Sequence, residues 1–295
     1  MSSIKLIYNL FYSLRPYQWT KNLVVFAAIL FAGEIFNLTE LLNVFYAFLL
    51  FSLIAGSGYI INDIIDIEQD KRHPFKKWRP IAAGKITIGT ARIFGFLLLC
   101  ISIGLAVLLN RTLGIILISY FFMTLAYSLK LKHIVILDII IVATGFVLRA
   151  VAGAVVIDAV ISPWLLVCTF FLALFLVIGK RRAELVSLKE EAGNHRAILE
   201  HYQPRMLDQM IAVVTAMSVV SYAQYTLDAS TVFHLGNNRM IFTIPFVIYG
   251  IFRYFYLIYK KELGGSPEKI LINDRGILIN LFLWTISVGY IIYSV

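Results

Sequence analysis

Residues 41–70 read LLNVFYAFLLFSLIAGSGYIINDIIDIEQD, an apolar run that passes into a group of acids. Residues 41–61 carry no charged side chain, and a transmembrane helix needs about 20 mostly apolar residues. The next nine residues hold three aspartates and one glutamate. The stretch therefore predicts a membrane-spanning helix that ends in a polar site at the membrane surface.

The rest of the chain is equally apolar. Of its 295 residues, 60% are hydrophobic and 15% are charged, and the mean hydropathy is +0.84, which excludes an ordinary soluble protein. Cys100 and Cys168 both lie in apolar stretches, which argues against a disulfide scaffold. We predict an all-α membrane protein, a single multi-pass domain over residues 1–295, with nine transmembrane helices. The predicted spans are 22–38, 41–61, 92–110, 112–129, 134–157, 162–179, 210–228, 241–258 and 277–294.

The basic residues fall on one side of these spans. If the segments between spans are assigned alternately to the two sides of the membrane, 22 of the 26 Lys and Arg residues lie on the side of the N-terminus. Two lie on the other side and two lie within spans. The positive-inside rule then puts the N-terminus in the cytosol and the C-terminus outside it. The net charge of +9 is explained by this orientation, so nucleic acid is not expected as a partner. We predict a cell-membrane protein whose active site faces the cytosol, capped by loops 62–91 and 180–209.

The acids after the second span are spaced for one helix face. Asn62, Asp66 and Asp70 stand four residues apart, and Asp63 lies three residues before Asp66. Like charges so close repel unless a cation lies among them, and carboxylate and amide oxygens suit Mg²⁺, which completes its shell with water and substrate phosphates. We predict that Asn62, Asp63, Asp66 and Asp70 hold Mg²⁺ and a diphosphate, with the three aspartates catalytic. The alternative is a solvated helix end, which does not require the intervening isoleucines.

A dense run of cations follows at residues 71–85. Acids followed by cations suit a metal-bound polyanion, because the metal binds on one side and free phosphate oxygens on the other. Within the fifth span, Asp138 and Arg149 are about 16 Å apart along the helix axis, too far for a direct pair. Both should face the bundle interior. Asp138, near the cytosolic end, is the better substrate-site candidate, and Arg149 is equally consistent with a tie to backbone carbonyls.

Several of these motifs resemble those of a known family. Asn62-Asp63-x-x-Asp66-x-x-x-Asp70 followed by Arg79-Pro80-Ile81-Ala82-Ala83-Gly84 resembles the first signature of the UbiA superfamily of intramembrane prenyltransferases. The similarity extends over roughly residues 12–205. It also includes the segment from Arg15 to Asn22, Tyr127-Ser128-Leu129-Lys130, and Gly145-Phe146-x-x-Arg149. The resemblance implies a UbiA-like bundle and a Mg²⁺-dependent transferase.

The chain departs from typical prenyltransferases after the sixth span. Their second aspartate-rich motif is replaced by Lys180-Arg181-Arg182, followed by Glu184. This resembles the decaprenyl-phosphate 5-phosphoribosyltransferase branch, which implies phosphoribosyl pyrophosphate as donor, a polyprenyl phosphate as acceptor, and a role in cell-envelope glycan precursor synthesis. The resemblance implies that Glu184 binds a ribose hydroxyl or orients Arg182. The implied substrate-binding residues are Lys21, Asn62, Arg79, Tyr127, Lys130, Asp138, Lys180, Arg181, Arg182 and Glu184.

Two other functions stay open at this point. A conventional member of the superfamily would move a prenyl group to an aromatic or other small acceptor, but it should carry an acidic second motif. A transporter should show repeated charges near the membrane midplane or helices broken in matching halves, and neither is evident. A homo-oligomer is compatible with the sequence.

Overall fold

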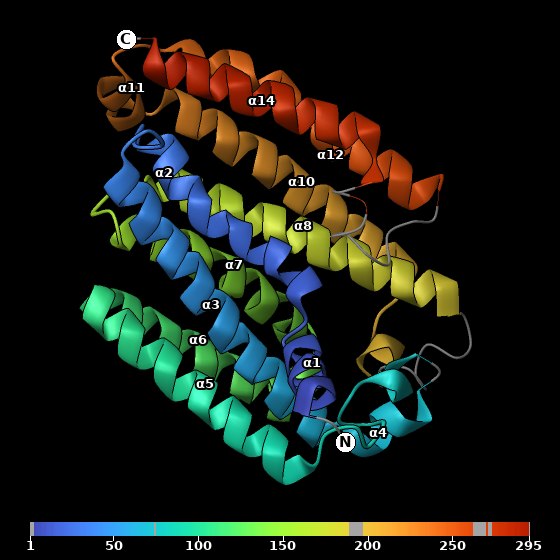
Figure 1. Ribbon diagram of the computed structural model, residues 1–295. Coiled ribbons are helices and arrows are strands. Elements are labelled where there is room, and N and C mark those ends of the chain that lie inside the picture. The colour runs from blue at the N-terminus through green and yellow to red at the C-terminus, as the bar shows by residue number, and fades with distance from the viewer. Residues whose placement is uncertain (1–2, 74, 189–196, 262–269, 271–272, 295) are drawn as a thin grey trace.

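The computed structural model is a bundle of long helices that run side by side (Figure 1). It describes residues 3–73, 75–188, 197–261, 270 and 273–294, in which no β-strand occurs. Within that part of the chain, eight helical stretches are long and apolar enough to cross a membrane, which confirms the all-helical membrane fold. They are α3 (Leu38–Ile65), α5 (Ile88–Leu109), α6 (Arg111–Leu129), α7 (Leu137–Val155), α8 (Pro163–Leu188), α10 (Pro204–Leu227), the 3₁₀ helix η6 (Arg239–Thr243) continued by α12 (Ile244–Tyr259), and α14 (Arg275–Tyr293).

The first predicted span, 22–38, is not a continuous α-helix, so nine regular membrane helices are not confirmed. The chain forms the 3₁₀ helix η1 (Pro16–Phe26) and the short α2 (Ala27–Phe31), then turns at Gly33, whose φ is +73°. These two elements pack against α3 and α7. They carry the chain along the bundle from the end where α1 lies to the opposite end (Figure 1). The segment is apolar enough to be taken for a span, but its packing partners hold it in a different conformation.

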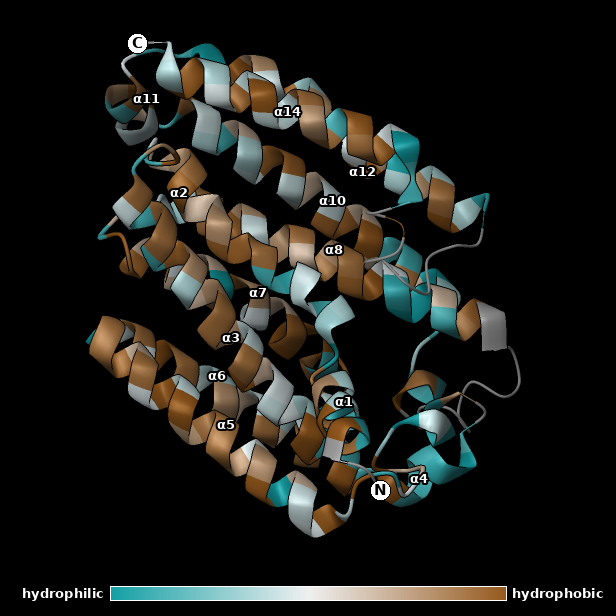
Figure 2. Ribbon diagram, viewed as in Figure 1, coloured by the Kyte–Doolittle hydropathy of each residue, from teal (hydrophilic) through white to brown (hydrophobic). Residues whose placement is uncertain are grey.

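The short elements that carry the predicted site gather at one end of the bundle, which we call the α4 end. Figure 1 shows α1 and α4 there, whereas α2, α11 and the C-terminus lie at the opposite end. Hydrophilic residues are concentrated around α4 and the C-terminal part of α8 (Figure 2). Other short elements of the chain have the bounds α1 (Ser3–Ser13), α4 (Ile67–Arg72), η2 (Lys76–Trp78), η3 (Leu131–His133) and η5 (Ala197–His201). At the opposite end, α11 spans Ala229–Leu235.

The helices differ in how much of their surface other helices cover. In the most apolar window of α3, 56% of the residues are buried, and in that of α7, 44%, against 17% in α5 and in α14. The two inner helices therefore form the centre of the bundle, and α5 and α14 lie at its periphery. Both inner helices end at the α4 end, α3 with its C-terminus and α7 with its N-terminus (Figure 1). A charged side chain at the buried end of either helix needs a partner of opposite charge, because an unpaired buried charge is strongly destabilising.

Helix α8 is longer than the sequence predicts. It continues to Leu188, so the basic run at residues 180–182 lies on its last turns and not in a loop. The predicted loop 180–209 accordingly begins on a helix, and residues 189–196 of it lie outside the described residues. A helical backbone fixes the direction of each side chain in this run, so neighbouring cations point to different partners.

Candidate functional site

Two buried aspartates form the centre of the candidate site at the α4 end. Asp63 lies in the last turn of α3 and Asp70 lies on α4, and each is only 2% exposed. Arg79 joins them, because its Nη1 donates to Asp63 Oδ1 at 3.0 Å and to Asp70 Oδ2 at 2.6 Å. Arg15 donates to the same Asp63 oxygen. We call these four residues the acid–arginine group, in which two positive and two negative charges balance.

Asp66 belongs to a different group because the helix is interrupted at this residue. Asp66 ends α3 with φ −92° and ψ 13°, and α4 begins at the next residue. Its carboxylate accepts from Lys132 Nζ at 2.8 and 3.0 Å, and from Asn62 Nδ2 at 3.1 Å. The prediction that Asn62, Asp63, Asp66 and Asp70 line one helix face is therefore corrected. The structure separates them into an Asn62–Asp66 pair and an Asp63–Asp70 pair.

The turn after η2 positions Arg79, a predicted phosphate ligand, against the acids. The carbonyl oxygen of Pro80 accepts from the backbone N–H of Lys85 at 2.8 Å, which closes the turn. Gly84 has φ +68°, a conformation that glycine adopts without steric cost. Ile81 is buried and packs in a small apolar core with Ile60 of α3. The turn is thus anchored to the same helix that carries Asp63.

Arg15 is a site residue to which the sequence analysis assigned no role. Its backbone is left-handed, with φ 52° and ψ 61°, which is uncommon for a residue with a side chain. The buried Leu14 beside it packs against Gly56 of α3, and the guanidinium of Arg15 lies 4.9 Å from the ring centre of Tyr59. The only signal in the sequence was the motif that begins Arg15-Pro16.

A second buried group joins α7, α8 and the chain after η5. Asp138 is fully buried and accepts from Arg181 Nε at 3.0 Å and from the Tyr202 hydroxyl at 2.7 Å. Arg181 Nη1 also donates to Glu184 Oε2 at 3.1 Å, so Glu184 orients Arg181. Burial, followed by the hydrogen bond to Asp138, raises the pKa of the Tyr202 phenol above its usual range. Tyr202 therefore stays a proton donor to the acid.

Arg182 points away from this group. It forms an ion pair with Asp208 of α10, and its guanidinium lies 4.1 Å from the ring centre of Tyr259 of α12. Tyr259 donates a hydrogen bond to the same Asp208 oxygen at 2.7 Å. Arg182 thus joins α8 to α10 and α12. Its partners here are an acid and an aromatic ring, whereas the sequence predicts that it binds phosphate.

The remaining predicted substrate-binding residues lie on α6, just after it, on α8 and on η1. Lys130 is exposed just after α6, and Tyr127 is half-buried on that helix. Lys180 on α8 and Lys21 on η1 are also half-buried. Lys132, which no prediction included, is nearer to the acids than Lys130 because it bonds directly to Asp66. Its position two residues after Lys130 was the only signal in the sequence.

Arg149 lies deeper in the bundle and is only 5% exposed. It donates from Nη1 to the Gly145 carbonyl oxygen at 2.6 Å, from Nε to Asn22 Oδ1 at 2.6 Å and from Nη2 to the Tyr120 hydroxyl at 2.9 Å. Arg149 is therefore bonded to a backbone carbonyl, as one of the two interpretations of the sequence expected. Asp138 is not among these three partners, in agreement with the distance of about 16 Å along the helix. Arg149 joins α7 to η1 and α6.

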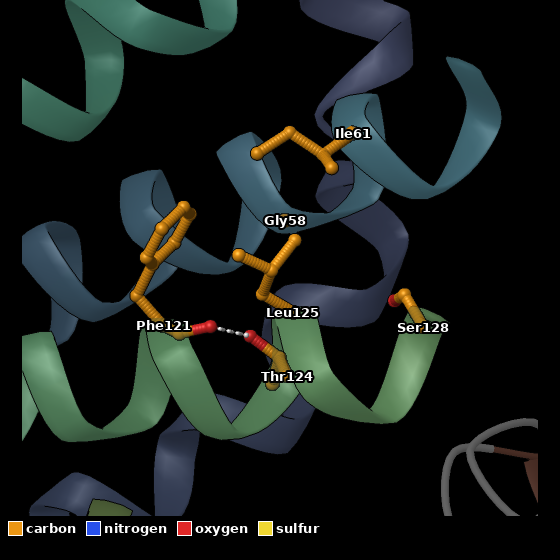
Figure 3. A pocket seen from close by; sticks show the side chains of 6 residues that line it. All are labelled: Gly58, Ile61, Phe121, Thr124, Leu125 and Ser128. Atoms are coloured by element: carbon orange, nitrogen blue, oxygen red, sulfur yellow. Dashed lines mark hydrogen bonds between the residues drawn. The ribbon is translucent and has the colours of Figure 1, made fainter. Parts of the chain in front are cut away.

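A small crevice lies between α3 and α6, within one helical turn of Asn62 (Figure 3). Its empty volume is about 160 Å³. Figure 3 shows Thr124 turned back onto its own helix, where its hydroxyl donates to the Phe121 carbonyl oxygen at 2.9 Å. Four of the six lining residues carry no polar side-chain atom, and the crevice is too tight to hold a ligand as it stands. Its lining residues are Gly58, Ile61, Phe121, Thr124, Leu125 and Ser128.

The donor chemistry of the acid–arginine group fits one Mg²⁺ ion. Mg²⁺ in proteins is usually bound by one or two carboxylates, with water and substrate phosphates as the other ligands. Asp63 and Asp70 supply two carboxylates close enough to bond to one nitrogen atom. Among the described residues, no group of three or more His, Cys, Asp or Glu side chains could hold a metal. Of the four predicted ligands, Asp63 and Asp70 are the two whose carboxylates the structure brings together through one nitrogen atom.

The family of the chain follows from its match to a family model. Residues 22–286 match the model of the UbiA prenyltransferase family. The chain belongs to this family. A solved structure of a UbiA homolog from Archaeoglobus fulgidus bound to GPP and Mg²⁺ has a TM-score of 0.73 at 20% identity, and the match covers 97% of this chain and 100% of that one. This likeness confirms the UbiA-like fold.

Close relatives of this UbiA family member carry a more specific name. A decaprenyl-phosphate phosphoribosyltransferase from Mycolicibacterium smegmatis is 36% identical over 98% of this chain and 93% of its own length. One from Corynebacterium glutamicum is 34% identical over 95% of this chain and 86% of its own length. The resemblance to this branch of the UbiA superfamily is thereby confirmed over nearly the whole sequence.

Proposed function

We propose that this protein transfers 5-phosphoribose from phosphoribosyl pyrophosphate to a polyprenyl phosphate and releases diphosphate, in a Mg²⁺-dependent reaction at the cytosolic face of the membrane. The observation that carries the proposal is the combination of near-full-length similarity to decaprenyl-phosphate phosphoribosyltransferases with a site in which acids and cations alternate. Both substrates carry phosphate groups, and such a site offers a metal on one side and guanidinium or ammonium groups on the other.

Asp63 and Asp70 would hold the Mg²⁺ ion, which neutralises charge on the departing diphosphate when it is bound. Arg79 and Lys132 lie beside these acids and are placed to bind phosphate oxygens. Lys130, Lys180 and Lys21 are further candidates for binding phosphate oxygens, and we infer that Lys21 lies nearer to the membrane entry. The protein then acts mainly by positioning the substrates and stabilising charge.

The acceptor needs no strong general base. A phosphate monoester has a second pKa of about 6, so a polyprenyl phosphate is largely ionised near neutral pH and can attack the ribose carbon directly. This agrees with the described part of the site, where Asp63, Asp66 and Asp70 are all paired with cations. Asp66 holds Lys132 in place, and Asp138, with Arg181 and Tyr202, fixes α7 and α8 around the site.

The decisive assay follows the label of radiolabelled phosphoribosyl pyrophosphate, with purified protein, a polyprenyl phosphate and Mg²⁺. Label in the lipid phase is the expected result. Label that stays water-soluble while an added prenyl diphosphate is consumed in the presence of an aromatic acceptor would instead establish conventional prenyl transfer.

A matched pair of variants on α4 tests the site. Asp70→Asn should abolish transfer, because it removes one of the two buried carboxylates. Glu68→Gln changes an exposed acid on the same helix, whose only recorded ion pair in the described part of the chain is with Lys71, and should leave transfer unchanged. Equal activity of both variants would remove the acid–arginine group from the mechanism.

A further inference from the structure

One nitrogen atom occupies the space between the two buried acids. Nη1 of Arg79 lies 3.0 Å from Asp63 Oδ1 and 2.6 Å from Asp70 Oδ2. A Mg²⁺ ion needs its oxygen ligands at about 2.0–2.1 Å, and its two positive charges would repel a guanidinium that is bonded to the same two oxygens. Arg79 and a divalent cation therefore compete for the same two atoms.

We propose that Arg79 is an exchangeable counter-ion, which neutralises Asp63 and Asp70 until a divalent cation takes their oxygens and then binds the phosphate groups of the substrate. The proposal rests on the proposed function only for the nature of that substrate. It assigns Arg79 an effect of definite sign: the arginine weakens the binding of the metal alone.

The burial of the two acids explains why such a counter-ion is needed. A buried carboxylate without a partner is strongly destabilising, because it has lost its hydration. Asp63 and Asp70 are each 2% exposed, so a cation must stay with them whether or not a metal is bound. Arg79 meets this need at both acids with one atom.

The two arginines of the group differ in how firmly their guanidinium groups are held beside the acids. The side chain of Arg15 is 12% exposed and that of Arg79 is 22% exposed. The guanidinium of Arg15 stacks on the ring of Tyr59 in addition to its bond to Asp63, so two groups hold it in place. Arg79 extends from a surface turn and makes its recorded side-chain contacts, within the described residues, only with the two acids. Arg79 is thus the arginine that a metal displaces.

The test is a Mn²⁺ titration of the full-length protein in nanodiscs of zwitterionic lipid, with free Mn²⁺ measured by electron paramagnetic resonance. Arg79→Gln should bind Mn²⁺ about tenfold more tightly than the wild type, a change of roughly 1.4 kcal/mol. Asp63→Asn should lose this binding. Equal or weaker binding by Arg79→Gln, or unchanged binding by Asp63→Asn, would overturn the proposal.

Two controls separate competition from general charge effects and from misfolding. Lys132→Gln removes the same charge from the neighbouring Asp66 and should change Mn²⁺ affinity less than about threefold; a gain equal to that of Arg79→Gln would count against exchange. In wild-type protein, Mn²⁺ should raise the modification of Arg79 by phenylglyoxal, located by peptide mapping, and unchanged or reduced modification would overturn the proposal even if Arg79→Gln does not fold. Neither measurement uses a sugar phosphate or a lipid acceptor, so failure of exchange and failure of the proposed transfer are distinguishable.

Discussion

The hydroxyl of Tyr202 makes two hydrogen bonds with opposite roles. It accepts from the backbone N–H of Ile136 at 2.8 Å and donates to Asp138 Oδ1 at 2.7 Å. Because Asp138 is fully buried, each donor to its carboxylate replaces a water molecule that the acid lost on folding. Tyr202 thus fixes the chain after η5 to the N-terminus of α7.

Tyr202→Phe should destabilise the protein by about 1–3 kcal/mol, because it leaves the backbone N–H of Ile136 and a buried carboxylate oxygen of Asp138 each without one partner. In a chain of this size such a loss lowers the unfolding temperature by a few degrees or more. The check is the temperature at which detergent-solubilised protein loses its monodisperse elution peak. Tyr12→Phe, at an exposed tyrosine of α1, is the matched control, and an equal loss in both variants would contradict the assignment.

The same tyrosine predicts a dependence on alkaline pH. Its pKa is raised in the folded protein by burial and by the hydrogen bond to Asp138. A raised pKa means that the unfolded chain releases the proton first, so the stability that Tyr202 contributes is present below about pH 10 and falls as the pH rises above it. We expect the stability difference between wild type and Tyr202→Phe to narrow when the same measurement is made at pH 11. A difference that widens there would contradict the sign.

At the level of the elements, hydropathy predicted α3 and the later long helices because each apolar run is long enough to cross a membrane by itself. It failed for η1, whose conformation depends on a residue far along the chain: Arg149, 127 positions after Asn22, holds the side chain of Asn22. The break at Asp66 was missed for the same reason, since its partner Lys132 is 66 residues away. Spacing within one helix carries no information about such partners.

The contact between α7 and η1 depends on a glycine. A Cβ atom at Gly153 would overlap the carbonyl oxygen of Val25, which is a backbone atom and cannot rotate away. Gly153→Ala should therefore push η1 off α7 and cost roughly 1–3 kcal/mol or more. Thermal loss of the monodisperse peak is again the measurement.

A second glycine provides the control for this change. Gly104 lies within α5, and a Cβ atom there would meet nothing within 4 Å. Gly104→Ala should be neutral or slightly stabilising, because alanine favours the helix by about 1 kcal/mol relative to glycine. If both variants were equally stable, the close approach of α7 and η1 would not be needed for the fold.

At the level of the whole molecule, the one-sided charge of the sequence predicts a site at one end of the bundle. The acid–arginine group, Lys132 and the Asp138 group all lie at the α4 end. What the charge distribution did not predict is which cation meets which acid. Arg181 and Arg182 are neighbours in the sequence, yet they pair with acids on α7 and α10, because successive residues of a helix point about 100° apart.

The orientation of the bundle is the remaining prediction from charge. The termini lie at opposite ends (Figure 1), and the positive-inside rule assigns the α4 end to the cytosol. In a background without Cys100 and Cys168, we expect a membrane-impermeant maleimide to label Asn238→Cys, beside α11, in intact cells. Lys77→Cys, at an exposed position in η2, should react only after permeabilisation. The reverse pattern would place the proposed site outside the cytosol, away from a soluble sugar phosphate, and labelling of both cysteines in intact cells would contradict their placement at opposite ends.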